Sequence, residues 1–508
     1  MTRITAISTS LPTWDSVPGR ALGYKWVTEK LQSNYPRFGV NTIVQKLASA
    51  VLTQLNISVE ENQKDCLVFP SQDAARHCIS FIRAHYKTSD IQAGVTEFRL
   101  RRGHKAGHDH VYNGVPLSSR WARFFAVVYD AEAKEGAHFW GMFGDGLGNR
   151  HAEFSFVDLG VYVCAFEYSN GTRATHTAVQ EQEGKVKKEI KSRIARLVTS
   201  ENSSLTPPTE SDVFLCPKGM SNKFPFPCWP YAETPKCVGN TGYARFTLYD
   251  QGSTSEIDDL ESGLSSGTQI RVLFCEVPSN PLLRTPDLHR IRALADKHNF
   301  IVVCDETLGT FINVDVLPYV DIAITSLTKI FNGAGNAMGG SVTLHDSLAA
   351  GYEDLLFSAE AQILAQSSRD IESRIHKCNV NALALSTFLS QQPYIKTVLY
   401  PFHSETRPLY KRYRRQNGGY GYVLSKLFAD PGMAIRFYNV LDMRKGPSVG
   451  TNFRLVLPYA WLVHVLDMEW AESQGIPRHI VRISVGLERE GDLISCVGRA
   501  LEGAARGG

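Results

Sequence analysis

IRVLFCEV (270–277), FIVVCDE (300–306) and VDIAITS (320–326) are three apolar runs of strand length, and they decide the fold. Between the first two lies LHRIRALADKHN (288–299), whose apolar residues share one helical face: Leu288, Ile291, Leu294 and Ala295. The Thr-Pro-Asp sequence at 285–287 predicts a helix start with proline at the first helical position. Helices between apolar strands predict an α/β fold with a mostly parallel, doubly wound central sheet.

Working outward, the patterning divides the chain into four parts. Prolines interrupt residues 1–40, and this pattern predicts an N-terminal arm. Residues 41–212 form an N-terminal extension of the large domain with an insertion, and periodic apolar residues predict helices at 42–56, 73–86 and 183–198. The sheet above belongs to a core at 213–352. Residues 353–508 begin with a helical stretch and predict a smaller C-terminal α/β domain.

Composition excludes several functional classes. The 508 residues carry a net charge of only +3, so no nucleic-acid or anionic membrane partner is predicted. No apolar stretch is long enough to span a membrane, and the N-terminus lacks the apolar core of a secretory signal. The ten cysteines form no CxxC pair, which argues against a zinc module and predicts buried free thiols in the cytoplasm. No metal site is predicted.

Reactive side chains follow two of the predicted strands. One strand ends in Asp305, and the other delivers Ser326, Thr328 and Lys329 before a glycine-rich turn. Ligand sites of open α/β sheets lie at the carboxyl ends of the strands. There a lysine can form an imine with pyridoxal phosphate, a carboxylate can keep its ring nitrogen protonated, and hydroxyls can bind its phosphate. By itself this spacing leaves a surface lysine and a strand-end cap as alternatives.

Four motifs in order resemble the Cys/Met-metabolism family of pyridoxal-phosphate enzymes: EVPSNPLL (276–283), VCDET (303–307), SLTK (326–329) and VRISVGLE (481–488). The likeness extends over nearly all of residues 213–505. SLPTW, YPRF and LVFPS, with the long segment before the core, resemble the N-terminally extended fungal branch of cystathionine γ-synthase. This resemblance implies the aspartate-aminotransferase-like fold of type I, with the cofactor bound by the 213–352 core.

The resemblance also implies the cofactor contacts. Lys329 is the Schiff-base lysine and proton shuttle, and Asp305 pairs with the pyridine nitrogen. The remaining implied cofactor contacts are Ser326, Thr328, Gly219 and Met220 at the phosphate, Tyr231 stacked on the ring, and Asn280 near the ring hydroxyl or the substrate carboxylate. A packing role remains open for Tyr231.

Substrate and subunit contacts follow from the same likeness. Arg482 would bind the substrate carboxylate through its planar guanidinium, with Ser448 beside it. Tyr35 and Arg37 match a Tyr-x-Arg motif that reaches the phosphate of a neighbouring subunit. The arm at 1–40 would therefore contact that subunit, in a homo-oligomer (a dimer of dimers) with shared active sites. A packing role for Ser448, a surface ion pair for Arg482 and a disordered arm are the alternatives.

One segment departs from the family pattern. A helix normally follows Gly-Met, whereas here SNKFPFPCWP (221–230) follows, and its three prolines cannot continue a helix. Either the phosphate site is rebuilt, with Lys218 adding charge, or cofactor binding is weakened.

The predicted function is γ-replacement on an O-acyl-L-homoserine, with cysteine as the nucleophile and cystathionine, a methionine precursor, as the product. A carbon or other nucleophile in specialised metabolism, and a C–S lyase, share this chemistry and stay open. A non-catalytic relative with an interaction or regulatory role is the alternative of another class. Retention of Lys329, Asp305, Ser326, Thr328 and Arg482 together argues against it.

Overall fold

The computed structural model describes residues 9–31, 34–35, 39–57, 64–85, 93–100, 110–112, 115–131, 139–140, 143–159, 163–165, 177–218, 247, 249, 252–344 and 352–506. The sequence predictions for Arg37, Gly219, Met220, Tyr231 and the segment 221–230 therefore lie outside the described residues.

The central sheet has five described strands in the order β7 (Val213–Cys216), β11 (Gly340–Leu344), β10 (Ile322–Thr325), β9 (Ile301–Asp305) and β8 (Val272–Glu276). The predicted strands β8, β9 and β10 are parallel to one another. β11 and β7 complete the sheet in antiparallel pairing. The predicted α/β fold is confirmed, and the three parallel strands end on the same edge of the sheet.

Helices cover this sheet because each has an apolar face. α11 (Leu288–His298) buries the four residues predicted for its face, α10 (Thr254–Ser265) lies beside it, and α8 (Thr177–Val198) packs near β7. The predicted start of α11 was early: the Asp287 side chain accepts a hydrogen bond from the Arg290 amide, so Asp287 is the N-cap and proline precedes the helix.

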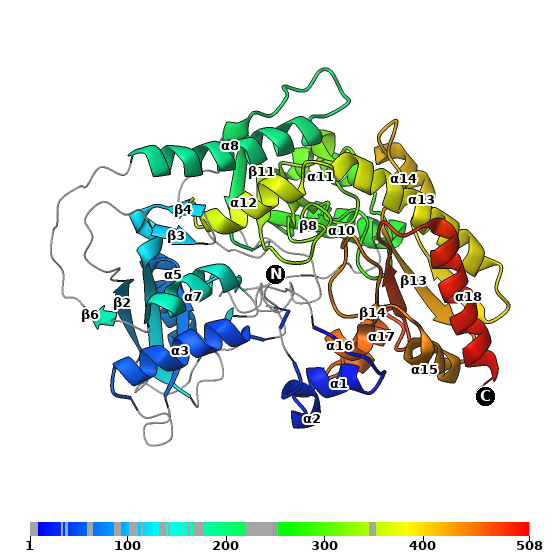
Figure 1. The fold of residues 1–508 in the computed structure, drawn as a ribbon. Helices are drawn as coiled ribbons and strands as arrows, with labels where there is room; N and C mark the ends of the chain where they lie inside the picture. The colour runs from blue at the N-terminus through cyan, green and yellow to red at the C-terminus, as the bar shows by residue number, and fades with distance from the viewer. Residues whose placement is uncertain are drawn as a thin grey trace.

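An N-terminal unit has a sheet of its own (Figure 1). Its hydrophobic core also includes Phe357 and Ala359 of the C-terminal part. Its described strands are antiparallel, in the order β1 (Lys64–Phe69), β5 (Arg123–Asp130), β2 (Gly94–Leu100) and β6 (Val163–Ala165). Its helices are α3 (Thr42–Gln54), α5 (Gln72–His85) and α7 (Asn149–Leu159), and the short strands β3 (His110–Tyr112) and β4 (Val115–Leu117) form a separate pair. Two of the predicted helices, at 42–56 and 73–86, are confirmed.

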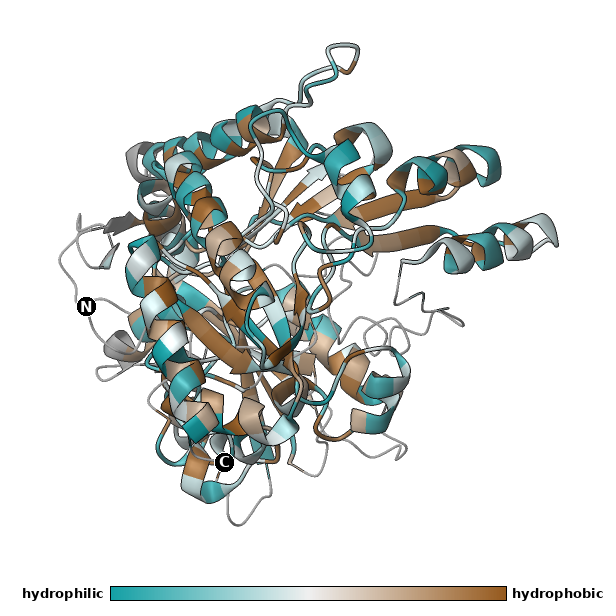
Figure 2. Cartoon of the chain, turned by 90° about the vertical axis from the view of Figure 1, so that its right-hand side faces the viewer, coloured by the Kyte–Doolittle hydropathy of each residue, from teal (hydrophilic) through white to brown (hydrophobic). Residues whose placement is uncertain are grey.

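The C-terminal part contains a second five-stranded sheet, in the order β12 (Ile395–Leu399), β13 (Val423–Phe428), β16 (Val481–Ser484), β15 (Leu455–Pro458) and β14 (Arg444–Lys445). Its helices are α12 (Ser358–Ser367), α13 (Ile371–Ser390), α14 (Arg407–Tyr413), α15 (Pro431–Val440), α16 (Tyr459–Val463), α17 (Met468–Ser473) and α18 (Glu490–Arg506). In Figure 2 the strands are largely apolar, whereas the helices show mixed faces. Burying those strands and the apolar helix faces stabilises the sheet.

The first described residues pack on this C-terminal part. Trp14 is almost fully buried, stacks on His479 and donates its amide proton to the Asn439 side chain at 2.7 Å. The Tyr438 hydroxyl donates to the Leu11 carbonyl at 2.6 Å. These contacts tie α1 (Ser16–Ala21) and α2 (Lys25–Thr28) to the same chain.

Two further expectations concern cysteines and membranes. Seven described cysteines are buried, as predicted: Cys216 and six free thiols, Cys66, Cys78, Cys275, Cys304, Cys378 and Cys496. Within the described ranges, none of the helices has the length and apolar character needed to cross a membrane.

Candidate active site

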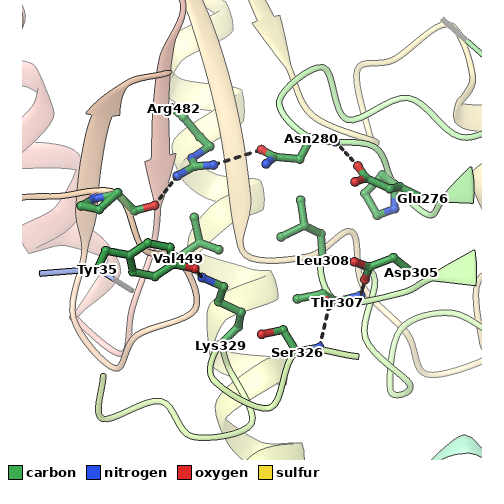
Figure 3. Close-up of a pocket in the computed structure, with 12 residues that line it drawn as sticks. Tyr35, Glu276, Asn280, Asp305, Thr307, Leu308, Ser326, Lys329, Val449 and Arg482 are labelled. Atoms are coloured by element: carbon green, nitrogen blue, oxygen red, sulfur yellow. Dashed lines mark hydrogen bonds between the residues drawn. The ribbon is translucent and has the colours of Figure 1, made fainter. Parts of the chain in front are cut away.

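A pocket opens at the carboxyl ends of β8, β9 and β10, where the central sheet faces the C-terminal part (Figure 3). Counting the space that opens to solvent, it encloses about 530 Å³. It is lined by Tyr35, Glu276, Pro278, Asn280, Asp305, Thr307, Leu308, Ser326, Lys329, Pro447, Val449 and Arg482. The fold thus gathers six residues predicted from sequence into one site: Tyr35, Asn280, Asp305, Ser326, Lys329 and Arg482.

Lys329 follows β10, and its ammonium reaches into the pocket. Its Nζ donates a hydrogen bond to the Tyr35 hydroxyl and lies 4.6 Å from the centre of the Tyr35 ring. Tyr35 therefore reaches the lysine of its own chain. The predicted sharing of active sites between subunits stays a prediction.

Asp305 ends β9 on the same edge of the sheet. One of its carboxylate oxygens accepts a hydrogen bond from the Thr307 amide at 2.7 Å. Burial raises the pKa of Asp305 to about 6, although the Thr307 hydrogen bonds and the positive charge of Lys329 lower it. Among the described residues no cation forms an ion pair with Asp305. A buried carboxylate in this state favours a cationic partner in the pocket.

The two predicted hydroxyls have different surroundings. Ser326 lines the pocket, and its amide donates to the Thr307 hydroxyl at 2.8 Å. Thr328 does not line the pocket, because its hydroxyl donates to the Gly339 carbonyl and accepts from the Gly339 amide. A phosphate contact for Thr328 stays a prediction, and the structure gives this hydroxyl another role, in closing the loop after Lys329.

Arg482 lies across the pocket from Asp305. Its guanidinium donates to the Asn280 side-chain oxygen at 3.1 Å and to the Pro447 carbonyl at 2.7 Å. The side chain is only 4 % exposed, yet no carboxylate in the described part of the chain pairs with it. A buried arginine without a counter-charge is a binding site for an anion. A surface ion pair is therefore excluded for the described residues.

Ser448 follows Pro447, whose carbonyl bonds Arg482, but it does not line the pocket. Its hydroxyl is buried and has no hydrogen-bond partner in the described part of the chain, although its neighbours Pro447 and Val449 both line the site. Its predicted role beside the substrate carboxylate stays a prediction.

Lys218 has a different neighbourhood from the one predicted. Its buried ammonium has no hydrogen-bond partner among the described residues and lies 4.4 Å from the ring centre of Trp140, in the N-terminal unit. Burial lowers the pKa of Lys218 to about 8. Lys218 is not part of the pocket lining, and its predicted contribution of charge at the phosphate site stays a prediction.

Of the six pocket residues that the sequence analysis missed, two have polar side chains, Glu276 and Thr307. Glu276 pairs in register with Asp305, and its carboxylate accepts the Asn280 amide proton at 2.7 Å. The signal was available, because Glu276 also ends a predicted parallel strand. Thr307 fixes both Asp305 and Ser326, which no spacing in the sequence indicates. Glu306 beside it is buried, and burial raises its pKa to about 8.

Comparison with known proteins agrees with this geometry. The chain is 42 % identical, over 98 % of its length and 92 % of the relative's, to cystathionine gamma-synthase-like protein ankD of Aspergillus thermomutatus. It is 30 % identical to the cystathionine gamma-synthase of Neurospora crassa, covering 98 % of this chain and 96 % of that one. The crystal structure of cystathionine gamma synthase from Xanthomonas oryzae pv. oryzae shares the fold, with a TM-score of 0.55 and 20 % identity over 67 % of this chain and 90 % of that chain.

The fold and the pocket define a pyridoxal-phosphate-dependent enzyme of fold type I. Residues 239–502 match the model of the Cys/Met metabolism PLP-dependent enzymes, and residues 43–148 match that of the N-terminal domain of fungal trans-sulfuration enzymes. The chain belongs to the Cys/Met metabolism PLP-dependent enzyme family.

The described residues fit this cofactor. A lysine, a buried carboxylate of raised pKa and a serine line one pocket, which are the groups that its aldehyde, its ring nitrogen and its phosphate require. Lys329, Asp305 and Ser326 would hold it.

Proposed function

We propose that this enzyme catalyses γ-replacement on an O-acyl-L-homoserine, with L-cysteine as the nucleophile and cystathionine as the product. The observation that carries the proposal is the buried guanidinium of Arg482, which pairs with no carboxylate of the described residues and lies in the pocket that also contains Lys329 and Asp305. An amino-acid substrate has the carboxylate that this guanidinium lacks. Its amino end would then lie toward Lys329.

The residues have separable tasks. Pyridoxal phosphate, when bound, supplies an electron sink that makes the substrate's Cα and Cβ protons acidic and allows the acyl group to leave Cγ. Arg482 holds the substrate carboxylate, and Asn280 orients the guanidinium through its side-chain oxygen. Lys329 Nζ accepts the Cα proton, releases it and then accepts the Cβ proton; protons return to Cβ and Cα once the cysteine sulfur has replaced the acyl carboxylate at Cγ. The Tyr35 hydroxyl, bonded to Nζ, keeps the amine oriented and can exchange a proton with it.

The test is a substrate screen of the purified, cofactor-loaded protein. O-acetyl-, O-succinyl- and O-phosphohomoserine would each be offered with cysteine, with other thiols and with carbon acids, and the products identified by mass spectrometry. Cystathionine as the fastest product supports the proposal. A new carbon–carbon bond would assign the chain to the alternative in specialised metabolism. Release of a 2-oxo acid and ammonia from every donor would assign it to the lyases.

Replacing Arg482 by lysine is expected to raise KM for the homoserine ester by roughly 10- to 100-fold, because one ammonium cannot reproduce a two-pronged hydrogen bond to a carboxylate, a difference of about 1.5–3 kcal/mol. The visible spectrum of the bound cofactor should stay unchanged. The matched control is Arg412→Lys, on the exposed side of α14, which should leave KM unaltered. An unchanged KM in Arg482→Lys would contradict the assignment of the substrate carboxylate.

We also propose that the chain forms a homo-oligomer, a dimer of dimers, in the cytoplasm. Five exposed large apolar side chains support a subunit contact near the N-terminal helices and α16–α17: Leu22, Tyr24, Trp26, Leu466 and Trp470. The six buried free thiols other than Cys216 support a reducing compartment.

The double variant Trp26→Ser/Leu466→Ser is expected to sediment as a smaller species than the wild type, because it removes apolar area from that contact. Val380→Ser, on exposed α13, is the control and should not change the mass. Equal masses for all three proteins would place the subunit contact elsewhere or show that the chain is a monomer.

A further inference from the structure

Hydrogen bonds within the loop after Lys329, and from α13, fix its backbone conformation. The Thr328 hydroxyl bonds both the amide and the carbonyl of Gly339, and the Asn332 side chain donates to the Ala337 carbonyl at 3.2 Å. Arg374 of α13 donates to two carbonyls at the start of the loop. Residues 328–339 therefore form a closed turn that fixes where Lys329 leaves the backbone.

One further bond fixes the far end of this turn from outside. The Met338 amide donates to the carboxylate of Glu360 at 3.2 Å, and Glu360 is in the first turn of α12. The same carboxylate oxygen accepts a hydrogen bond from Arg150 at 2.7 Å, and Arg150 belongs to α7 of the N-terminal unit. Both side chains are at most 6 % exposed.

A buried carboxylate is an energetically unfavourable acceptor for the single backbone amide of Met338. A neutral side chain could accept the same hydrogen bond, whereas a buried carboxylate carries a desolvation penalty of several kcal/mol unless a cation compensates it. Burial raises the pKa of Glu360, and Arg150 opposes that shift. Glu360 can therefore accept the Met338 proton as a carboxylate only while Arg150, and with it the N-terminal unit, is in place.

We propose that Arg150 and Glu360 are positioning residues through which docking of the N-terminal unit holds the Lys329 loop in the conformation that receives the cofactor. The path runs from α7 through Glu360 to Met338, then through the Gly339–Thr328 bonds to the residue before Lys329. Every step is a direct hydrogen bond or a peptide bond. The proposal takes the role of Lys329 from the proposed function, but it concerns the cofactor-free protein and needs no substrate.

The test measures amide hydrogen exchange of segment 331–340 in the cofactor-free protein. In Arg150→Met the carboxylate loses its counter-charge, and exchange in this segment should become at least about tenfold faster. In R150M/E360Q no buried charge remains to be compensated. The side-chain oxygen of the new glutamine can still accept a hydrogen bond from the Met338 amide, so most of the protection from exchange should return. R150M/E360L is also uncharged but has no acceptor, and exchange should stay fast. The two double variants thus differ in the hydrogen bond alone.

Ser118→Ala is the control from the same interface. Its hydroxyl is buried and donates to Glu183 of α8 at 2.8 Å, and within the described part of the chain neither residue forms a hydrogen bond with the loop. This variant should leave exchange in 331–340 unchanged, and titration with pyridoxal phosphate should weaken about tenfold only in R150M and R150M/E360L. Equal exchange in R150M/E360Q and R150M/E360L, or loosening in Ser118→Ala as large as in Arg150→Met, would overturn the proposal. A protected loop in a protein without γ-replacement activity would reject only the proposed function.

Discussion

Replacing Lys329 by alanine is expected to abolish the visible absorption band that appears when pyridoxal phosphate is added, and to lower turnover by at least about 10³-fold. The physical reason is that Nζ is the amine directed into the pocket, next to the Tyr35 hydroxyl, where we propose that it is both the covalent attachment point and the base. The measurement is an absorption titration with the cofactor, followed by steady-state kinetics.

Surface lysines also react with free pyridoxal phosphate, so a matched lysine variant is needed. Lys297→Ala, in the exposed last turn of α11, should keep the wild-type band and rate. The thermal midpoint of cofactor-free Lys329→Ala should stay close to that of the wild type if only the amine has been lost. A visible band of full intensity in Lys329→Ala would reject this lysine as the attachment point.

Asp305→Asn should lower activity by roughly 10²–10³-fold, because an amide cannot balance a cationic ring nitrogen as a carboxylate does. The same substitution should stabilise the cofactor-free protein. The pKa of Asp305 is about 6 in the folded protein, against an ordinary value of 3.8. The folded state therefore binds this proton more tightly than the unfolded state, and ionisation destabilises the fold as pH rises from about 4 to 6. Above pH 6 the full penalty, about 3 kcal/mol, remains.

Thermal unfolding of the cofactor-free proteins at pH 4 and pH 8 measures this effect. The midpoint of Asp305→Asn should exceed that of the wild type at pH 8, and the difference should shrink at pH 4, where wild-type Asp305 is protonated. Asp259→Asn, on the exposed face of α10, is the control and should show no such pH-dependent gain. A lower midpoint for Asp305→Asn at both pH values would mean that the carboxylate stabilises the empty site.

The order of strands and helices in the core could be predicted because each strand is a continuous apolar run, whereas the helix between them has apolar residues at helical spacing. The runs at 270–277, 300–306 and 320–326 contain β8, β9 and β10, and 288–299 contains α11. The antiparallel pairing of β11 with β10 could not be predicted, because apolar content does not encode direction. The separate sheet of the N-terminal unit was also missed, since its strands pair across loops of variable length.

The site could be predicted only where a strand end or a family motif marks the residue. Asp305 and Lys329 follow strands, and Asn280 and Arg482 lie within quoted motifs. Arg150 and Glu360 carry no such mark: they are 210 positions apart and meet only because two packed units bring α7 against α12. For Thr328 the family motif marks the residue, but its hydroxyl bonds Gly339 in this structure. Its predicted phosphate contact stays a prediction.

The pocket is assembled from residues as far apart as Tyr35 and Arg482, and this spacing sets an order of events during synthesis on the ribosome. Domains fold as units while the chain emerges, N-terminal parts first. Lys329 and Asp305 leave the ribosome before Arg482, on β16, has been translated. A pocket that contains both Lys329 and Arg482 is therefore completed late in synthesis, and a nascent chain stalled before β16 would expose Lys329 without the guanidinium that lines the same pocket.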